Sequence, residues 1–179
     1  LYLGSIYLNI SKKSWRNTFR LLLTPGFVVT VILYVILNVA NRNKLAYSWD
    51  EFSHWADVVK MMATQNQFAS DPMSGSLFKS YVPAMALFQY NFQVLGQMLV
   101  RGFEFSEWRI YLSYQLATYS LLVYFLKDLN WKKPHLVSAS AIAIFLIPSA
   151  FYSFFDVIYI DPFLGIIAGF TFAQAVLFN

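Results

Sequence analysis

Acidic residues and a histidine gather in the segment 49–57, which reads Trp-Asp-Glu-Phe-Ser-His-Trp-Ala-Asp. Ser48 directly precedes the segment, and Glu51 lies three residues after Ser48, as in a capping box. We therefore expect a helix that begins here and continues to about Gln67. Two tryptophans in the segment are suited to a membrane–water boundary.

On such a helix Asp50, His54 and Asp57 would share one face, because they are spaced by four and three residues. A carboxylate half-buried at a membrane boundary has a raised pKa and can accept a proton from a hydroxyl, so Asp50 is a candidate general base. The array could also hold a divalent metal ion, with Asp50 and His54 as ligands. The alternative is that Asp50 and Glu51 only favour a helix N-terminus electrostatically.

A second acidic spot contains Asp156 and Asp161, close to long apolar runs. Acidic residues beside hydrocarbon are costly and suggest a function. The alternative is that Asp161 caps a helix that begins at Pro162.

Three basic residues, Lys79, Arg101 and Arg109, are candidate phosphate partners at the level of lipid headgroups. Each of them could equally be an interfacial anchor.

The composition places these residues in a membrane protein. Of 179 residues, 58% are hydrophobic and only 12% are charged, which is too few charges to cover a water-facing surface. The net charge of +4 comes from basic residues that flank apolar runs, so it does not indicate a nucleic-acid partner. No cysteine is present, which excludes disulfides and thiol chemistry.

Apolar runs predict an all-α integral membrane module with about four spans. The chain begins with Leu1 in an apolar stretch and ends directly after another, so we expect a piece of a longer chain. The expected order is a cytoplasmic basic lead-in at 1–20 after an earlier helix, spans at 21–41, 108–126, 136–154 and 162–179, and an outer loop at 42–107 with juxtamembrane helices.

The segment Ser80–Val100 is the ambiguous apolar run, because it carries three glutamines and an asparagine. If it lies in the membrane interface, the basic residues before 21 and those at 127–133 share the cytoplasmic side, as the positive-inside rule requires. If it spans, the second basic cluster lies on the wrong side, and the two acidic spots lie on opposite faces. We therefore predict that it lies flat or re-entrant on the outer face.

The order of these features resembles the membrane glycosyltransferases of GT-C fold. This group includes protein mannosyltransferases and aminoarabinose transferases, often called family 39-like. A basic tail, a first span and an acidic motif (Asp50-Glu51) are followed by an outer loop with a Tyr-Pro-Pro segment, here Tyr81-Val82-Pro83. The stretch Gly102 to Arg109 and the later Asp161 continue the pattern, so the chain resembles the N-terminal part of such an enzyme.

The resemblance implies sugar transfer from a polyprenyl-phosphate donor to a hydroxyl of a lipid, glycan or protein acceptor, with inversion. Asp50 would be the general base with Glu51 beside it, and Lys79, Tyr81 and Arg101 would bind the donor. His54, Asp57, Asp156 and Asp161 would support the site. No cofactor is required beyond a divalent ion at most. The expected location is the bacterial plasma membrane, with the site on the outer face.

Two alternatives belong to other classes. A transporter or flippase of envelope intermediates would carry polar residues at mid-depth and inverted repeats, whereas the sequence has few such residues and no repeat. A polysaccharide polymerase or ligase would share the charged outer loop but usually has more spans.

Overall fold

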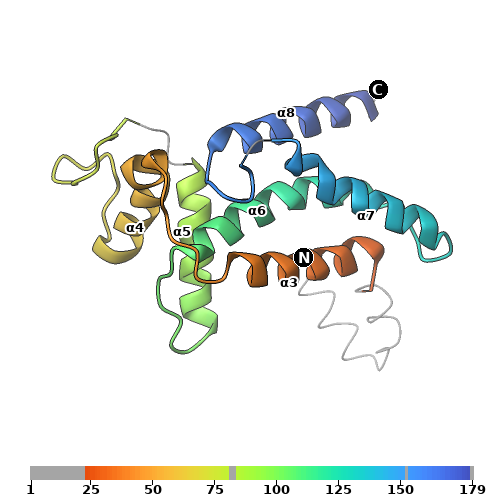
Figure 1. Cartoon of the computed structure of the whole chain (residues 1–179), viewed down its shortest axis with the longest axis horizontal. Helices are drawn as coiled ribbons and strands as arrows, with labels where there is room; N and C mark the ends of the chain where they lie inside the picture. The colour runs from red at the N-terminus through yellow and green to blue at the C-terminus, as the bar shows by residue number, and fades with distance from the viewer. Residues whose placement is uncertain (1–22, 81–83, 152, 178–179) are drawn as a thin grey trace, which may run out of the picture.

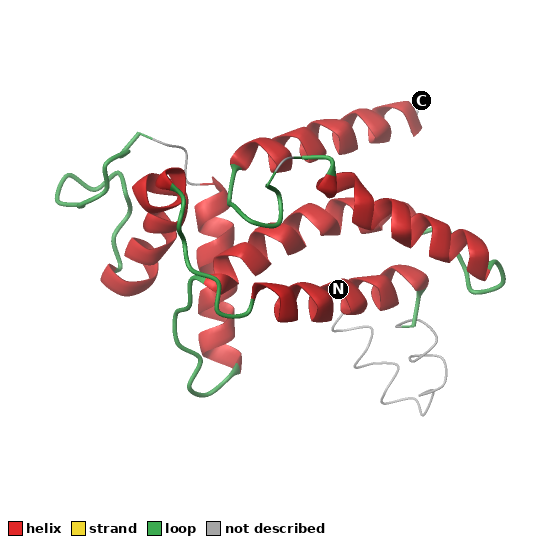
Figure 2. Cartoon of the chain, in the orientation of Figure 1, coloured by secondary structure: helices red, strands yellow, loops and turns green. Residues whose placement is uncertain are grey.

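The computed structural model describes residues 23–80, 84–151 and 153–177, and these residues form helices, turns and loops without a strand (Figure 2). The all-α class is therefore confirmed for the described chain. The basic lead-in at 1–20 and Tyr81 lie outside the described residues. The elements are α3 (Pro25–Asn41), the π-helix η1 (Glu51–Trp55), α4 (Ala56–Gln65), α5 (Ala84–Leu99), α6 (Trp108–Val123), the 3-10 turn η2 (Tyr124–Leu126), α7 (Pro134–Ser149) and α8 (Ile160–Leu177).

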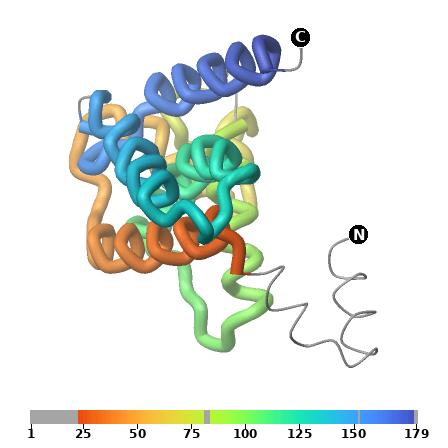
Figure 3. The backbone as a smooth tube through the Cα atoms, turned by 90° about the vertical axis from the view of Figure 1, so that its right-hand side faces the viewer, coloured from red at the N-terminus to blue at the C-terminus, as the bar shows by residue number. Residues whose placement is uncertain are grey.

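Four helices run lengthwise beside one another, and α5 crosses them at one end (Figure 1). In both views α6 and α7 lie between α3 and α8 (Figure 3). Of the described helices, α8 is long and apolar enough to cross a membrane, while α3 and α7 are shorter apolar helices. The first and last residues of α3 and α8 lie within a few residues of the ends of the expected spans 21–41 and 162–179.

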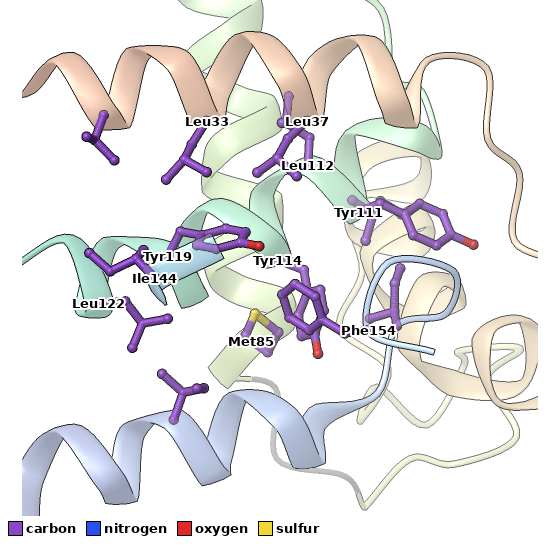
Figure 4. Packing of buried hydrophobic residues seen from close by; sticks show 14 of the residues in the cluster. Leu33, Leu37, Met85, Tyr111, Leu112, Tyr114, Tyr119, Leu122, Ile144 and Phe154 are labelled. Carbon is purple, nitrogen blue, oxygen red and sulfur yellow. The ribbon is translucent and has the colours of Figure 1, made fainter. Parts of the chain in front are cut away.

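The central helix is α6, which contacts α3, α5, α7 and α8. Ten of its 16 residues are buried, among them Tyr111, Tyr114 and Tyr119. Tyr114 and Tyr119 both pack against the ring of Phe154, at centroid distances of 5.3 and 6.0 Å (Figure 4). Other parts of the chain therefore surround α6 on most sides.

The other lengthwise helices bury one stripe each and expose large apolar side chains. In α3 the buried residues Val29, Leu33 and Leu37 recur every fourth position, and Val35 on another face is 53% exposed. In α8 only Pro162 and Ile166 are buried. Contiguous apolar exposure of this kind is unusual in a water-soluble domain and fits contact with lipid.

The crossing helix α5 buries polar side chains on the face that meets the rest of the chain. It buries Gln89 and Gln93, whose side-chain amides donate to the carbonyl oxygens of Ile110 and Ser106 at 3.2 and 3.3 Å. Its exposed residues include the apolar Met98 and Leu99, and the polar Asn91 and Gln97 are exposed as well. Two of the three glutamines that make Ser80–Val100 look ambiguous in sequence therefore face the protein, where they fasten α5 to α6 and to the loop before it.

Candidate functional site

The two acidic segments meet at one end of the bundle, which we call the acidic end and define by residues 44–57 and 154–161. The loop after α3 leads into η1, and the loop before α8 lies against it (Figure 1). The Tyr111 hydroxyl donates to the Leu45 carbonyl at 3.1 Å, and the Lys44 ammonium lies 5.5 Å from the Tyr111 ring centroid. The core helix α6 thus fixes the loop that carries the acidic motif.

Glu51 is the structural centre of the acidic end. Its side chain is fully buried, and its Oε2 accepts hydrogen bonds from the backbone N–H groups of Tyr47 and Ser48, both at 3.0 Å. Its Oε1 accepts from the N–H of Ile158 at 2.9 Å. A buried carboxylate is costly unless it is hydrogen-bonded in this way. One side chain therefore joins the loop after α3 to the loop before α8.

These contacts favour a positioning role for Glu51 over the catalytic role that the resemblance implies. The bond to Ser48 is one half of the predicted capping box. The other half is not formed, because the Ser48 hydroxyl is buried without a partner. Asp50 is partly exposed beside it, so of the two adjacent acids only Asp50 can reach a substrate.

The helix that carries the acidic motif begins with a π-helical turn, Glu51–Trp55. Its bonds run from residue i to i+5, so the side chains are wound differently from those of an α-helix. Asp50 acts electrostatically on His54, whereas Asp57 interacts with Ser76 and Lys60. The π-helical turn departs from the α-helical spacing from which the shared face of Asp50, His54 and Asp57 was predicted, and their grouping into one cluster stays a prediction.

His54 lies in a partly apolar surrounding. Its ring packs edge-on against the rings of Trp55 and Phe78, at centroid distances of 4.3 and 5.0 Å, and its Nδ1 is 2.8 Å from the Ser53 hydroxyl. Burial lowers the pKa of His54, and the nearby Asp50 carboxylate opposes that shift. The imidazole is therefore mainly neutral at neutral pH.

Asp57 faces a separate small cavity of about 120 Å³, lined also by Phe52, Lys60 and Glu107. Lys60 and Glu107 form an ion pair at 3.1 Å, and the second oxygen of Glu107 accepts from the Ala46 N–H at 2.9 Å. Burial raises the pKa of Asp57, while the nearby Ser76 hydroxyl and the charge of Lys60 lower it. This cavity lies on the side of α4 that faces the beginning of α6.

The second acidic spot is joined to the first by Lys44. Its ammonium group donates to the Phe155 carbonyl and lies 3.9 Å from the Asp156 carboxylate. Asp161 is exposed in the first turn of α8, which begins at Ile160, and its charge is favourable there. Sequence reasoning missed Lys44 and Lys60 as partners of acids, although the near balance of charge in the loop 42–107 was a signal for such pairs.

The predicted donor-binding residues are not all brought together. Lys79 follows Phe78, whose ring touches His54, and its ammonium donates to the Pro72 carbonyl at 2.8 Å. Arg101 follows the other end of α5, whose 16 residues span about 24 Å at 1.5 Å per residue. Lys79 therefore follows directly a residue that contacts His54, whereas Arg101 follows the far end of α5. Tyr81 is outside the described residues.

Within the described ranges, no three His, Cys, Asp or Glu side chains are placed to hold one metal ion. The predicted divalent ion would have at most the two side chains of Asp50 and His54 as ligands.

No known protein family, curated protein or solved structure matches the chain.

Proposed function

We propose that the chain is a four-span membrane module with the acidic end on the outer face. The exposed apolar faces of α3, α7 and α8 support this placement, as does the basic turn at 127–133 at the opposite end. The crosswise α5, with Gln89 and Gln93 inward and large apolar residues among its exposed positions, is suited to the membrane interface. The α6 segment extends through η2 to Leu126, and most residues of α6 are buried against the other helices.

The function we propose is transfer of a sugar from a polyprenyl-phosphate donor to an acceptor hydroxyl. Asp50 takes the hydroxyl proton as the acceptor oxygen bonds to the anomeric carbon, and the bond from that carbon to the phosphate oxygen breaks with inversion. The carboxylate also favours the positive charge that develops on the sugar ring. The phosphate leaves with the electron pair of the broken bond, and Lys79, which follows Phe78 beside His54, is the candidate cation for it.

One observation carries the proposal: the Glu51 carboxylate bonds to the Ile158 N–H at 2.9 Å. This bond brings Asp50 and the second acidic segment to one end of the bundle, as a joint site on one face of the membrane requires. Asp50 is partly exposed there and lies beside a neutral histidine. Within the described residues a divalent ion would find two ligands at this point, and no step of the proposed reaction passes through one.

The test is sugar transfer by the full-length protein with Asp50→Asn. We expect the transfer rate in membranes, measured with a labelled polyprenyl-phosphate sugar, to fall by about a hundredfold or more, as for loss of a general base. Asp71→Asn is the matched control, because Asp71 lies in the same loop and its Oδ1 only accepts from the Met73 N–H. Near-normal transfer by Asp50→Asn at an unchanged protein level would refute the assignment.

The topology can be tested separately, since the chain has no cysteine of its own. Single cysteines at Ser70, Asn130 and Asp156 are all at exposed positions. With a membrane-impermeant thiol reagent in intact cells, we expect labelling at 70 and 156 and none at 130. Labelling at 130 but not at 156 would place the acidic segments on opposite faces.

A transporter is the second candidate, and a buried polar pair favours it. The Asn41 amide donates to the Gln115 side-chain oxygen at 2.6 Å, and the Gln115 amide nitrogen is buried without a partner. Such groups inside a membrane often mark a polar path. If the parent chain showed no sugar transfer and the opposite-face labelling were found, this candidate would replace the transferase.

A further inference from the structure

A groove of about 580 Å³ lies between α3, α5 and α6, away from the acidic segments. Its walls are mainly apolar and include Leu33, Tyr34, Phe88, Phe92, Leu116 and Val123. Tyr34 and Phe88 are 44% and 46% exposed, so the groove is open on the side of the bundle that the proposed topology turns toward lipid.

The two aliphatic hydroxyls in the groove are already satisfied. Thr30 donates to the Gly26 carbonyl at 2.8 Å, and Ser120 donates to the Ala117 carbonyl at 2.7 Å. Both bonds are made within the residue's own helix. The groove therefore offers hydrocarbon surface with few unmet polar groups, which suits an alkyl or isoprenoid chain better than a polar ligand.

A cation lies in line with the groove at one end. Arg109 precedes Leu116, Ser120 and Val123 by 7, 11 and 14 residues on α6, which places all four on one helix face. Tyr34, a groove residue, is close enough to interact electrostatically with the Arg109 guanidinium. Arg109 stacks on the Phe103 ring at 3.6 Å from its centroid, which orients the planar group.

We propose that this groove binds one lipid with a phosphate headgroup, with its hydrocarbon chain between α3, α5 and α6 and its phosphate on Arg109. The guanidinium supplies parallel N–H donors that match phosphate oxygens. An apolar helix of a protein partner would cover the groove but leave the cation without a counter-charge. The proposal rests on the membrane placement above and not on sugar transfer.

The experiment is native mass spectrometry of the purified full-length chain in detergent, titrated with defined lipids. Phosphatidylglycerol and undecaprenyl phosphate represent the two sources of a lipid phosphate, and dioleoylglycerol has hydrocarbon chains without one. We expect one phosphate lipid to bind at least tenfold more tightly than dioleoylglycerol. A preference for either phosphate lipid supports the site and identifies its natural source. Equal binding of all three lipids, or no binding, would overturn the proposal.

Variants locate the lipid in the groove. Arg109→Gln should weaken binding of the phosphate lipids about tenfold or more, as for loss of a charge-assisted contact, whereas Arg42→Gln, at an exposed position after α3, should not. Ser120→Leu should obstruct the groove and weaken binding of both lipid types, whereas Ser138→Leu on the exposed face of α7 should not. Unchanged binding by Arg109→Gln and Ser120→Leu would refute the site.

Asp50→Asn separates this inference from the proposed function. The variant should bind lipid like the parent chain even if transfer is lost. Failure of the transferase proposal would therefore leave the lipid site standing, and failure of lipid binding would leave the assignment of Asp50 untouched.

Discussion

The two ends of the helix bundle are built differently. At the end with the basic turn, consecutive helices are joined by the short connection 127–133, and Trp131 Nε1 donates a single hydrogen bond to the Leu23 carbonyl at 2.7 Å. At the acidic end, one buried carboxylate holds three backbone N–H groups from two loops, next to a π-helical turn. The few contacts of the basic turn are enough to connect two helices. The hydrogen bonds of Glu51 at the acidic end also fix side chains in place, as a functional site requires.

The largest expected effect comes from removing the charge that joins the loops of the acidic end. In Glu51→Gln one of the two accepting oxygens becomes an amide donor, so at least one buried N–H loses its partner. We expect the free energy of unfolding to fall by about 3 kcal/mol, as for a buried hydrogen bond to a charged group. Chemical unfolding in detergent, followed by circular dichroism, measures the change.

The matched change at the other end is Trp131→Phe, which removes one exposed hydrogen bond. Its expected cost is about 1 kcal/mol. If both variants lowered the free energy of unfolding equally, the contrast between the two ends would be lost.

A smaller effect is expected from Gly96 of α5, where the lack of a side chain leaves room for Phe103 of the loop 100–107. A methyl group on Gly96 would lie 2.1 Å from the Phe103 ring, so Gly96→Ala forces this ring to move. Since overpacking typically costs about 1–3 kcal/mol, we expect a loss of about 2 kcal/mol in unfolding experiments.

Gly169→Ala provides the control for this prediction. Nothing lies within 4 Å of the added methyl group in α8, and alanine favours a helix over glycine by about 1 kcal/mol. The two substitutions should therefore have opposite signs. A stabilising Gly96→Ala would show that Phe103 does not pack as described.

The smallest expected effect is the dependence of stability on pH, which arises at the acidic end. Because burial holds the pKa of His54 below 6.5, the unfolded chain takes up a proton first as the pH falls. The free energy of unfolding should then decrease as the pH drops from about 6.5 toward the folded pKa. Unfolding midpoints at about pH 7.5 and 5.5 test this, and the difference should shrink in His54→Gln.

Asp57 acts with the opposite sign and at lower pH. Burial raises its pKa above 3.8, so the folded chain keeps this proton to a higher pH than the unfolded chain does. The free energy of unfolding should fall as the pH rises through that range. In Asp57→Asn this pH dependence of the free energy of unfolding should be absent. If the unfolding midpoint of the variant still fell over the same pH range, the dependence would belong to another group.

Much of the helical layout could be predicted from composition and hydropathy. The expected segment 108–126 coincides with α6 and η2, and α8 begins two residues before the predicted 162. Apolar runs bounded by charge determine such segments locally. The ambiguity of Ser80–Val100 could not be resolved locally, because the same glutamines could face lipid, water or protein. Only the contacts of Gln89 with α6 and of Gln93 with the loop before it decided that these two face protein.

The amino-acid sequence by itself determined the all-α class, the absence of thiol chemistry and the concentration of acidic residues in the two segments of the acidic end. Tertiary structure decided which acid is buried. Glu51 and Asp50 are neighbours with the same chemistry, but Glu51 meets an N–H that lies 107 residues away, and Asp50 remains partly exposed. Local spacing contains no information about such a partner. The π-helical turn at Glu51–Trp55 was likewise not predicted from the spacing of the acidic motif.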